Sequence, residues 1–180
     1  MVAGCLSGGP RPVSSWPVHA CVVAKPAAKP TFGVTRLSQL VVRAPFDARQ
    51  LAVLRDDATM ADDPYNRFPA APSQLLKGPA MDVLASSGKF AAVVGSTSAA
   101  SVSHVAEITV TALQLDCKEG DGGEPRREAQ VGVSLLVLDR DRAIVGMGEG
   151  FGTGDARKGN YGEAFSIAFT SSLLAALEDL

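Results

Sequence analysis

The stretch that decides the fold runs from Asp62 to Gly88 and reads DDPYNRFPAAPSQLLKGPAMDVLASSG. Its first part is a short aromatic segment, Tyr65–Phe68, with prolines on both sides, and this arrangement predicts a loop. Its second part repeats apolar residues at spacings of three and four, which predicts a helix that packs on a core. Gly88 is expected to end this helix.

The helix is expected to begin directly after Pro72, because the missing N–H of a proline costs nothing in the first helical turn. A further proline then interrupts the pattern at Gly78-Pro79. Pro79 cannot donate a hydrogen bond to the carbonyl of Leu75, and its ring crowds the preceding turn. We therefore predict a kink or a break in the helix at this pair.

Apolar runs and alternation predict the strands that surround this helix. The expected strands are Trp16–Ala24, Gly33–Ala44, Leu51–Arg55, Phe90–Val94, Val102–Asp116, Val131–Leu138 and Ala143–Phe151. Within Val102–Asp116, the side chains of Ala106, Ile108, Val110 and Ala112 are expected to share one face. The last element, Tyr161–Leu180, carries its large apolar residues on one face and predicts a second core helix.

This order of elements does not alternate as a doubly wound sheet would. It predicts an α+β fold with a mostly antiparallel, mixed sheet and two main helices packed on one face. The opposite face of the sheet is then expected to be partly solvated or to meet a partner. The predicted domain covers residues 16–180, and residues 1–15 are predicted to be a tether.

Glycine occupies every second position from Gly146 to Gly154. The spacing invites comparison with a phosphate-binding loop, but the third glycine of a dinucleotide motif is absent, and Asn160 follows where a P-loop needs lysine. The alternation instead indicates a strand face against which another element packs closely. No cofactor site is expected here.

Composition narrows the classes of function further. With 17 basic and 19 acidic residues among 180, and no basic cluster, the chain has no electrostatic signature of nucleic-acid binding. Three cysteines and two histidines lack metal-ligand spacing, so no metal site is expected. Whether Cys21 and Cys117 form a disulfide is left open, because the sequence does not give their distance.

The residues Val2-Ala3-Gly4-Cys5 match a lipobox, the motif at which a bacterial lipoprotein is cut and its cysteine lipidated. Cys5 is therefore a candidate lipidation site, although the basic and apolar regions of a secretory signal do not precede it. We expect that the signal was already removed or that the start is misassigned. Gly, Pro and Ser residues follow Cys5, as in a flexible tether.

No catalytic set is apparent, and the chain is not expected to be an enzyme. Ser86 and Lys89 have the spacing of a Ser-x-x-Lys motif, but the serine lies at the end of a helix and the companion motifs are absent. A hydrolase built on His104 and a serine or carboxylate of the nearby Ser-rich loop remains an alternative. A carrier with an apolar cavity of roughly a few hundred Å³ between sheet and helices is another.

The segment Asp63-Pro-Tyr-Asn-Arg-Phe68, the preceding Pro45-Phe46 turn and the lipobox together resemble the ABC-type transport auxiliary lipoprotein components. This family includes the paraquat-inducible protein C type of envelope lipoprotein. The resemblance covers about residues 13–180 and rests on pattern and order. The chain departs from it at Phe68, where many relatives carry tryptophan, at Gly78-Pro79 and in its late glycines.

The resemblance implies a non-enzymatic accessory protein of an ABC transporter that carries a mammalian-cell-entry (MCE) type subunit. Such systems are thought to move lipids between the inner and outer membranes. The protein would lie in the periplasm, be anchored to the outer membrane through the lipid on Cys5, and dock on the MCE subunit, either as a single copy or as a homo-oligomeric ring. Leu6 and Ser7 after the cysteine agree with the outer membrane.

Four residues of the family segment are candidate contacts: Asp63, Tyr65, Arg67 and Phe68. Their structural interpretation is a loop in which Arg67 pairs with Asp63 while the aromatic rings plug the base of the helix. Their functional interpretation is contact with a partner or a lipid, since arginine and aromatic residues are enriched at interface hot spots.

Overall fold

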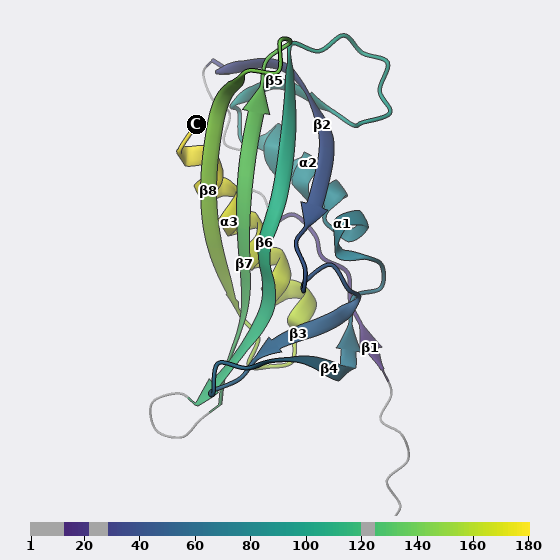
Figure 1. Ribbon diagram of the computed structural model, residues 1–180, viewed down its shortest axis with the longest axis vertical. Coiled ribbons are helices and arrows are strands. Elements are labelled where there is room, and N and C mark those ends of the chain that lie inside the picture. The colour runs from purple at the N-terminus through teal and green to yellow at the C-terminus, as the bar shows by residue number, and fades with distance from the viewer. Residues whose placement is uncertain (1–12, 22–28, 120–124) are drawn as a thin grey trace, which may run out of the picture.

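The computed structural model describes residues 13–21, 29–119 and 125–180 (Figure 1). In chain order its elements are β1 (Ser14–Ser15), β2 (Phe32–Val42), β3 (Gln50–Leu54), β4 (Met60–Arg67), α1 (Pro72–Leu75), α2 (Lys77–Ser86), β5 (Phe90–Val94), β6 (His104–Glu119), β7 (Pro125–Leu138), β8 (Ile144–Asp155) and α3 (Tyr161–Glu178). The strands form one mixed sheet with the helices packed on it, which confirms the predicted α+β class.

Strand β6 is the axis of the sheet. One of its edges pairs antiparallel with β7 along its length, and β7 pairs antiparallel with β8, so that these three strands form a meander. Its other edge is shared, because β2 pairs parallel with the first part of β6 and β3 pairs parallel with the last part. β5 extends the sheet beyond β2, and β4 and β1 extend it beyond β3. The longest ladders are therefore antiparallel within a mixed sheet.

The helices cover one face of the sheet (Figure 1). Helix α3 packs on β7 and β8, while α2 packs on β5 and contacts α3. The first helix does break, but at Leu76, where α1 gives way to α2, and not at the predicted Gly78-Pro79 pair, which lies in the first turn of α2. Gly88, with φ of 71°, follows the end of α2 as expected. None of the described helices is both long and apolar enough to cross a membrane.

The alternating glycines of β8 form the close-packing face that the sequence indicates. Four of them lie directly against the backbone of α3, so that a methyl group on any one would overlap a carbonyl oxygen of the helix. In order, Gly148, Gly150, Gly152 and Gly154 face the carbonyls of Ala176, Ser172, Ala168 and Ala164. The helix residues recur at every fourth position, so α3 presents a stripe of small side chains to a strand face that has none.

A bulge in β6 corrects the predicted burial pattern of that strand. Ala106, Ile108 and Val110 are buried, as predicted, but Ala112 is only half-buried. Burial continues instead with Leu113 and Leu115. The register with β7 shifts between Val110 and Ala112, and one extra residue moves the buried face by one position.

The strand predicted for Trp16–Ala24 is wrong for residues 16–21, which form no strand and run along α3 instead. Residues 22–24 of the predicted strand lie outside the described residues. The backbone N–H of His19 donates to Ser166 Oγ at 2.9 Å. The N–H of Cys21 donates to Thr170 Oγ1 at 3.0 Å. Helix hydroxyls thus satisfy the amides that a neighbouring strand would have satisfied.

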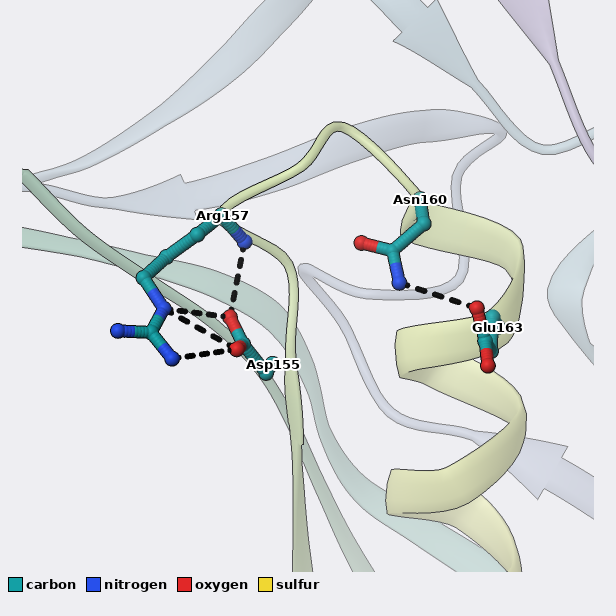
Figure 2. Close-up of polar contacts among 4 residues, drawn as sticks. All are labelled: Asp155, Arg157, Asn160 and Glu163. Carbon is teal, nitrogen blue, oxygen red and sulfur yellow. Dashed lines mark hydrogen bonds and ion pairs between the residues drawn. The ribbon is translucent and has the colours of Figure 1, made fainter.

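The connection from β8 into α3 carries two local polar pairs (Figure 2). The guanidinium of Arg157 lies 2.6 Å from Asp155, and its hydrogen bonds lower the pKa of that carboxyl to about 2. Asn160 Nδ2 donates to Glu163 Oε2 at 3.1 Å across the first turn of the helix. Because both pairs are exposed, they orient the connection more than they stabilise the fold.

The glycine contact predicts the outcome of two matched substitutions. Gly150→Ala should lower the free energy of unfolding by about 1–3 kcal/mol or more, because its methyl group would overlap the carbonyl of Ser172 and force the helix away from the sheet. Gly78→Ala, in the exposed part of α2, meets nothing within 4 Å beyond its chain neighbours and should change it by less than about 1 kcal/mol, because the better helix propensity of alanine is opposed by the crowding of its Cβ against Pro79.

Urea unfolding followed by circular dichroism measures both values. Equal effects of the two substitutions would show that α3 does not depend on close approach to β8.

Candidate functional site

A cleft of about 450 Å³ lies between the β3–β4 pair, the end of β6, the start of β7 and the first turn of α3. Its lining combines apolar and polar groups, and two of the four candidate contacts from the sequence are among them. The lining side chains that matter for its chemistry are Asp63, Tyr65, Leu115, Cys117, Arg127 and Tyr161.

The segment that carries the candidate contacts is not a loop, as the sequence predicts, but strand β4. Its register with β3 shifts where Gln50 pairs with Arg67 and the next residue, Leu51, pairs with Asp63. The intervening residues of β4 bulge away from β3, which is how a strand tolerates Pro64. Prolines on both sides of the segment obscured this strand.

Asp63 organises the bulge and does not pair with Arg67 among the described residues. Its Oδ1 accepts hydrogen bonds from the backbone N–H of Tyr65 at 2.8 Å and of Asn66 at 3.0 Å. Its Oδ2 accepts a bond from Asn66 Nδ2 at 2.9 Å. The predicted Asp63–Arg67 pair is therefore wrong, because the carboxylate is engaged within its own turn.

The four candidate contacts do not gather in one place. Asp63 and Tyr65 line the cleft, and Tyr65 is 45% exposed. Arg67 is exposed at the end of β4. Phe68 is 1% exposed and lies in the core, with its ring centroid 5.0 Å from that of Trp16 and 5.6 Å from that of Phe165. The structural interpretation thus holds for Phe68, while Tyr65 and Asp63 line the cleft.

Cys117 lies half-buried at the cleft, and its thiol is free, as is that of Cys21. Burial raises the pKa of the Cys117 thiol, and the nearby positive charge of Arg127 offsets this only in part. Arg127 also donates from Nη1 to Tyr161 Oη at 3.4 Å. A thiol with a raised pKa is a poor nucleophile at neutral pH, so this group fits contact with a ligand better than covalent chemistry.

The sheet face opposite the helices, which the sequence predicts to be partly solvated or to meet a partner, carries a second feature whose residues the sequence analysis did not name. On β8 the odd-numbered residues face outward, and three of them are large and apolar: Val145 is 45% exposed, Met147 61% and Phe151 58%. A shallow hollow of about 480 Å³ lies beside Phe151 and Gly132. The signal was present in the sequence, because every second residue of the glycine row is free to face the solvent.

Candidate sites for metal were searched over the described ranges 13–21, 29–119 and 125–180. No group of three or more histidine, cysteine, aspartate or glutamate side chains gathers there in a way that could hold a metal ion. Cys5, the candidate lipidation site, lies outside the described residues.

No family model matches the chain, and no curated protein matches it. Several solved structures do resemble this chain in fold. A protein from Xanthomonas campestris assigned to the DUF330 family superposes with a TM-score of 0.70 at 15% identity, covering 93% of this chain and 95% of that one. An uncharacterised protein gives a TM-score of 0.57 at 14% identity over 93% of this chain and 94% of its own.

A PelC dodecamer chain from Paraburkholderia phytofirmans superposes less well, with a TM-score of 0.47 at 20% identity over 88% of this chain and 95% of that one.

The likeness to the Xanthomonas campestris protein covers nearly all of both chains. At 15% identity it shows that the two proteins share a fold.

The raised pKa of Cys117 predicts slow alkylation. At pH 8 iodoacetamide should modify the folded protein at Cys117 much more slowly than at the exposed Cys21, because less of the Cys117 thiol is ionised and burial limits access. Peptide mapping by mass spectrometry after timed quenching measures both rates. In urea the two rates should converge; comparable rates in the folded protein would contradict the assignment.

Proposed function

We propose that this protein is a non-enzymatic auxiliary lipoprotein of an ABC-type transport system with an MCE-type subunit. In this proposal the lipid on Cys5 anchors it to the outer membrane, the domain lies in the periplasm, and the system moves lipids between the two membranes. The sequence resemblance over residues 13–180 supports the assignment. One structural observation carries it: a strand face with large exposed apolar side chains is left uncovered on the side opposite the helices.

That face has the properties of a protein-docking surface. Met147 pairs across the sheet with the half-buried Leu136, and Phe151 lies opposite Gly132, which leaves its ring standing over a hollow. A large aromatic side chain beside a concavity is a common form of interface hot spot. The exposed Glu149 stands between Met147 and Phe151 in the same row, so the surface combines large apolar side chains with a charged one.

Strand β8 also has only one strand neighbour, β7, among the described residues. An exposed edge strand offers unpaired backbone groups to a partner strand. The outward side chains and the open edge therefore belong to the same element. We place the contact with the MCE subunit there, and a homo-oligomer would use the same strand or its flanks.

The proposal needs no catalysis from this chain. ATP hydrolysis would belong to another subunit, and the alternating glycines of β8, which could suggest nucleotide binding, contact α3 instead. The tether after Cys5 would let the domain reach its partner while it remains anchored to the membrane.

The test is recovery of partners from solubilised cell envelopes. Tagged full-length protein, expressed in its native host, should copurify with an MCE subunit, and mass spectrometry should find an acylated Cys5. The double variant Met147→Ser/Phe151→Ser should reduce recovery of the MCE subunit by about tenfold or more, as expected for loss of two apolar anchors.

The matched control is Ile167→Ser/Leu174→Ser, which removes two apolar side chains that are 39% and 37% exposed on α3. It should retain recovery of the MCE subunit. An unmodified N-terminus with no transporter subunit would overturn the assignment, whereas equal losses in both variants would overturn only the placement of the contact on β8.

A further inference from the structure

A third concave region lies at the end of the sheet far from the cleft. It is bounded by the start of β6 and by the turn between β7 and β8, and its volume is about 350 Å³. These two segments lie at the same end of the sheet (Figure 1). Ser103, His104, Val105, Arg140 and Arg142 line it, together with Asp139. We call this region the polar hollow. None of its lining residues contributes to the cleft or to the exposed row on β8.

Two arginines stand at the accessible rim of the polar hollow, where they alternate along the turn with Asp139 and Asp141. Arg140 is exposed, and among the described residues it has no hydrogen-bond or ion-pair partner. Arg142 lies 3.6 Å from Glu107 but its side chain is 77% exposed, so this ion pair is loose. Both guanidinium groups therefore keep most of their donors for a ligand.

Two of the three nearby carboxylates, those of Asp139 and Glu107, are hydrogen-bonded, while Asp141 is exposed in the same turn. Asp139 Oδ1 accepts hydrogen bonds from the backbone N–H of Asp141 at 2.8 Å and of Ala143 at 2.9 Å, and so closes the turn. Glu107 accepts a bond from Gln39 Nε2 at 3.1 Å. Asp139 and Glu107 position the turn and the adjacent strands, and the two arginines remain as the mobile positive charges at the rim.

A hydrogen-bond chain forms the other wall. His104 Nδ1 lies 2.9 Å from Ser103 Oγ, and Ser103 Oγ lies 3.2 Å from the carbonyl oxygen of Val34, to which it can donate. The His104 ring packs edge-on against Phe32 at 5.4 Å. These contacts hold the ring in place, and the second ring nitrogen has no partner among the described residues.

Neighbouring Arg36 reinforces this end of the sheet. It pairs with Val105 across the β2–β6 ladder, and its Nη2 donates to the carbonyls of Ser98 at 3.2 Å and Ala100 at 2.9 Å. The loop that leads into Ser103 is thereby fixed against the sheet. Its guanidinium also adds positive charge beside the polar hollow.

We propose that the polar hollow binds an oxyanion of the phosphate class. Arg140 and Arg142 supply charge-assisted hydrogen bonds, and Ser103 and His104 form the opposite wall. The volume is near the lower limit for small-ligand pockets, so it fits a single headgroup and not an acyl chain. A phospholipid headgroup and a free phosphate share this chemistry. The inference does not rest on the proposed function.

Two binding measurements on the full-length protein test the proposal and separate the two sources. Calorimetric titration with inorganic phosphate reports the free anion. Cosedimentation with vesicles of phosphatidylglycerol, compared with vesicles of phosphatidylcholine, reports an anionic headgroup. Arg140→Gln/Arg142→Gln should weaken whichever binding the wild type shows by about tenfold or more, because two charge-assisted contacts are lost.

The matched control is Arg55→Gln/Lys158→Gln, which removes the same charge from exposed positions outside the polar hollow. It should leave affinity within about twofold, since exposed distant charges are screened by salt. Circular dichroism confirms that both variants fold. An equal loss of affinity in the two variants would show that net charge alone determines binding, and this would overturn the proposal. Absence of binding to phosphate and to both vesicle types would overturn it as well.

Discussion

The contact between the glycine row of β8 and the backbone of α3 is the constraint on which the rest of the structure depends. Because the helix carbonyls occupy the space of absent Cβ atoms, the even-numbered positions of β8 from 148 to 154 are restricted to glycine. Glycine weakens a strand, and here pairing with β7 along the whole strand and dense contact with α3 compensate for that cost. The odd-numbered positions have no such restriction, since their side chains face outward.

Strand β6 determines where the two concave regions, the polar hollow and the cleft, form. It is longer than either of its parallel neighbours, so β2 borders its first part and β3 its last part. Concave regions form at both of its ends: the polar hollow with Ser103 and His104 at the start, and the cleft with Cys117 at the end. The bulge after Val110 lies between the part of β6 that pairs with β2 and the part that pairs with β3. It lets β6 bury alternate residues in both parts, although the buried positions shift by one residue.

The sequence predicted what local periodicity controls. The helix break near Pro79, the end at Gly88, the core face of α3 and the close-packed glycines all follow from spacing and from proline or glycine chemistry. It failed where distant residues decide. His19 and Cys21 bond to hydroxyls of α3 in place of a strand, and no local pattern reveals such partners. Asp63 accepts hydrogen bonds from the backbone of its own bulge, and this bulge lets β4 include Pro64. From the sequence alone, the prolines of this segment predict a loop.

The separation between positions fixed by backbone contact and positions open to substitution explains how such a fold persists while its surfaces diverge. The likeness to the Xanthomonas campestris protein covers 93% of the chain at only 15% identity, so few side chains are needed to preserve the backbone arrangement. In β8 the fixed and the free positions alternate residue by residue. Substitution of Met147 or Phe151 changes what the sheet presents without disturbing the helix beneath it, because the core contact is made by backbone atoms. A docking face built on such a strand can therefore change its partner at little cost in stability.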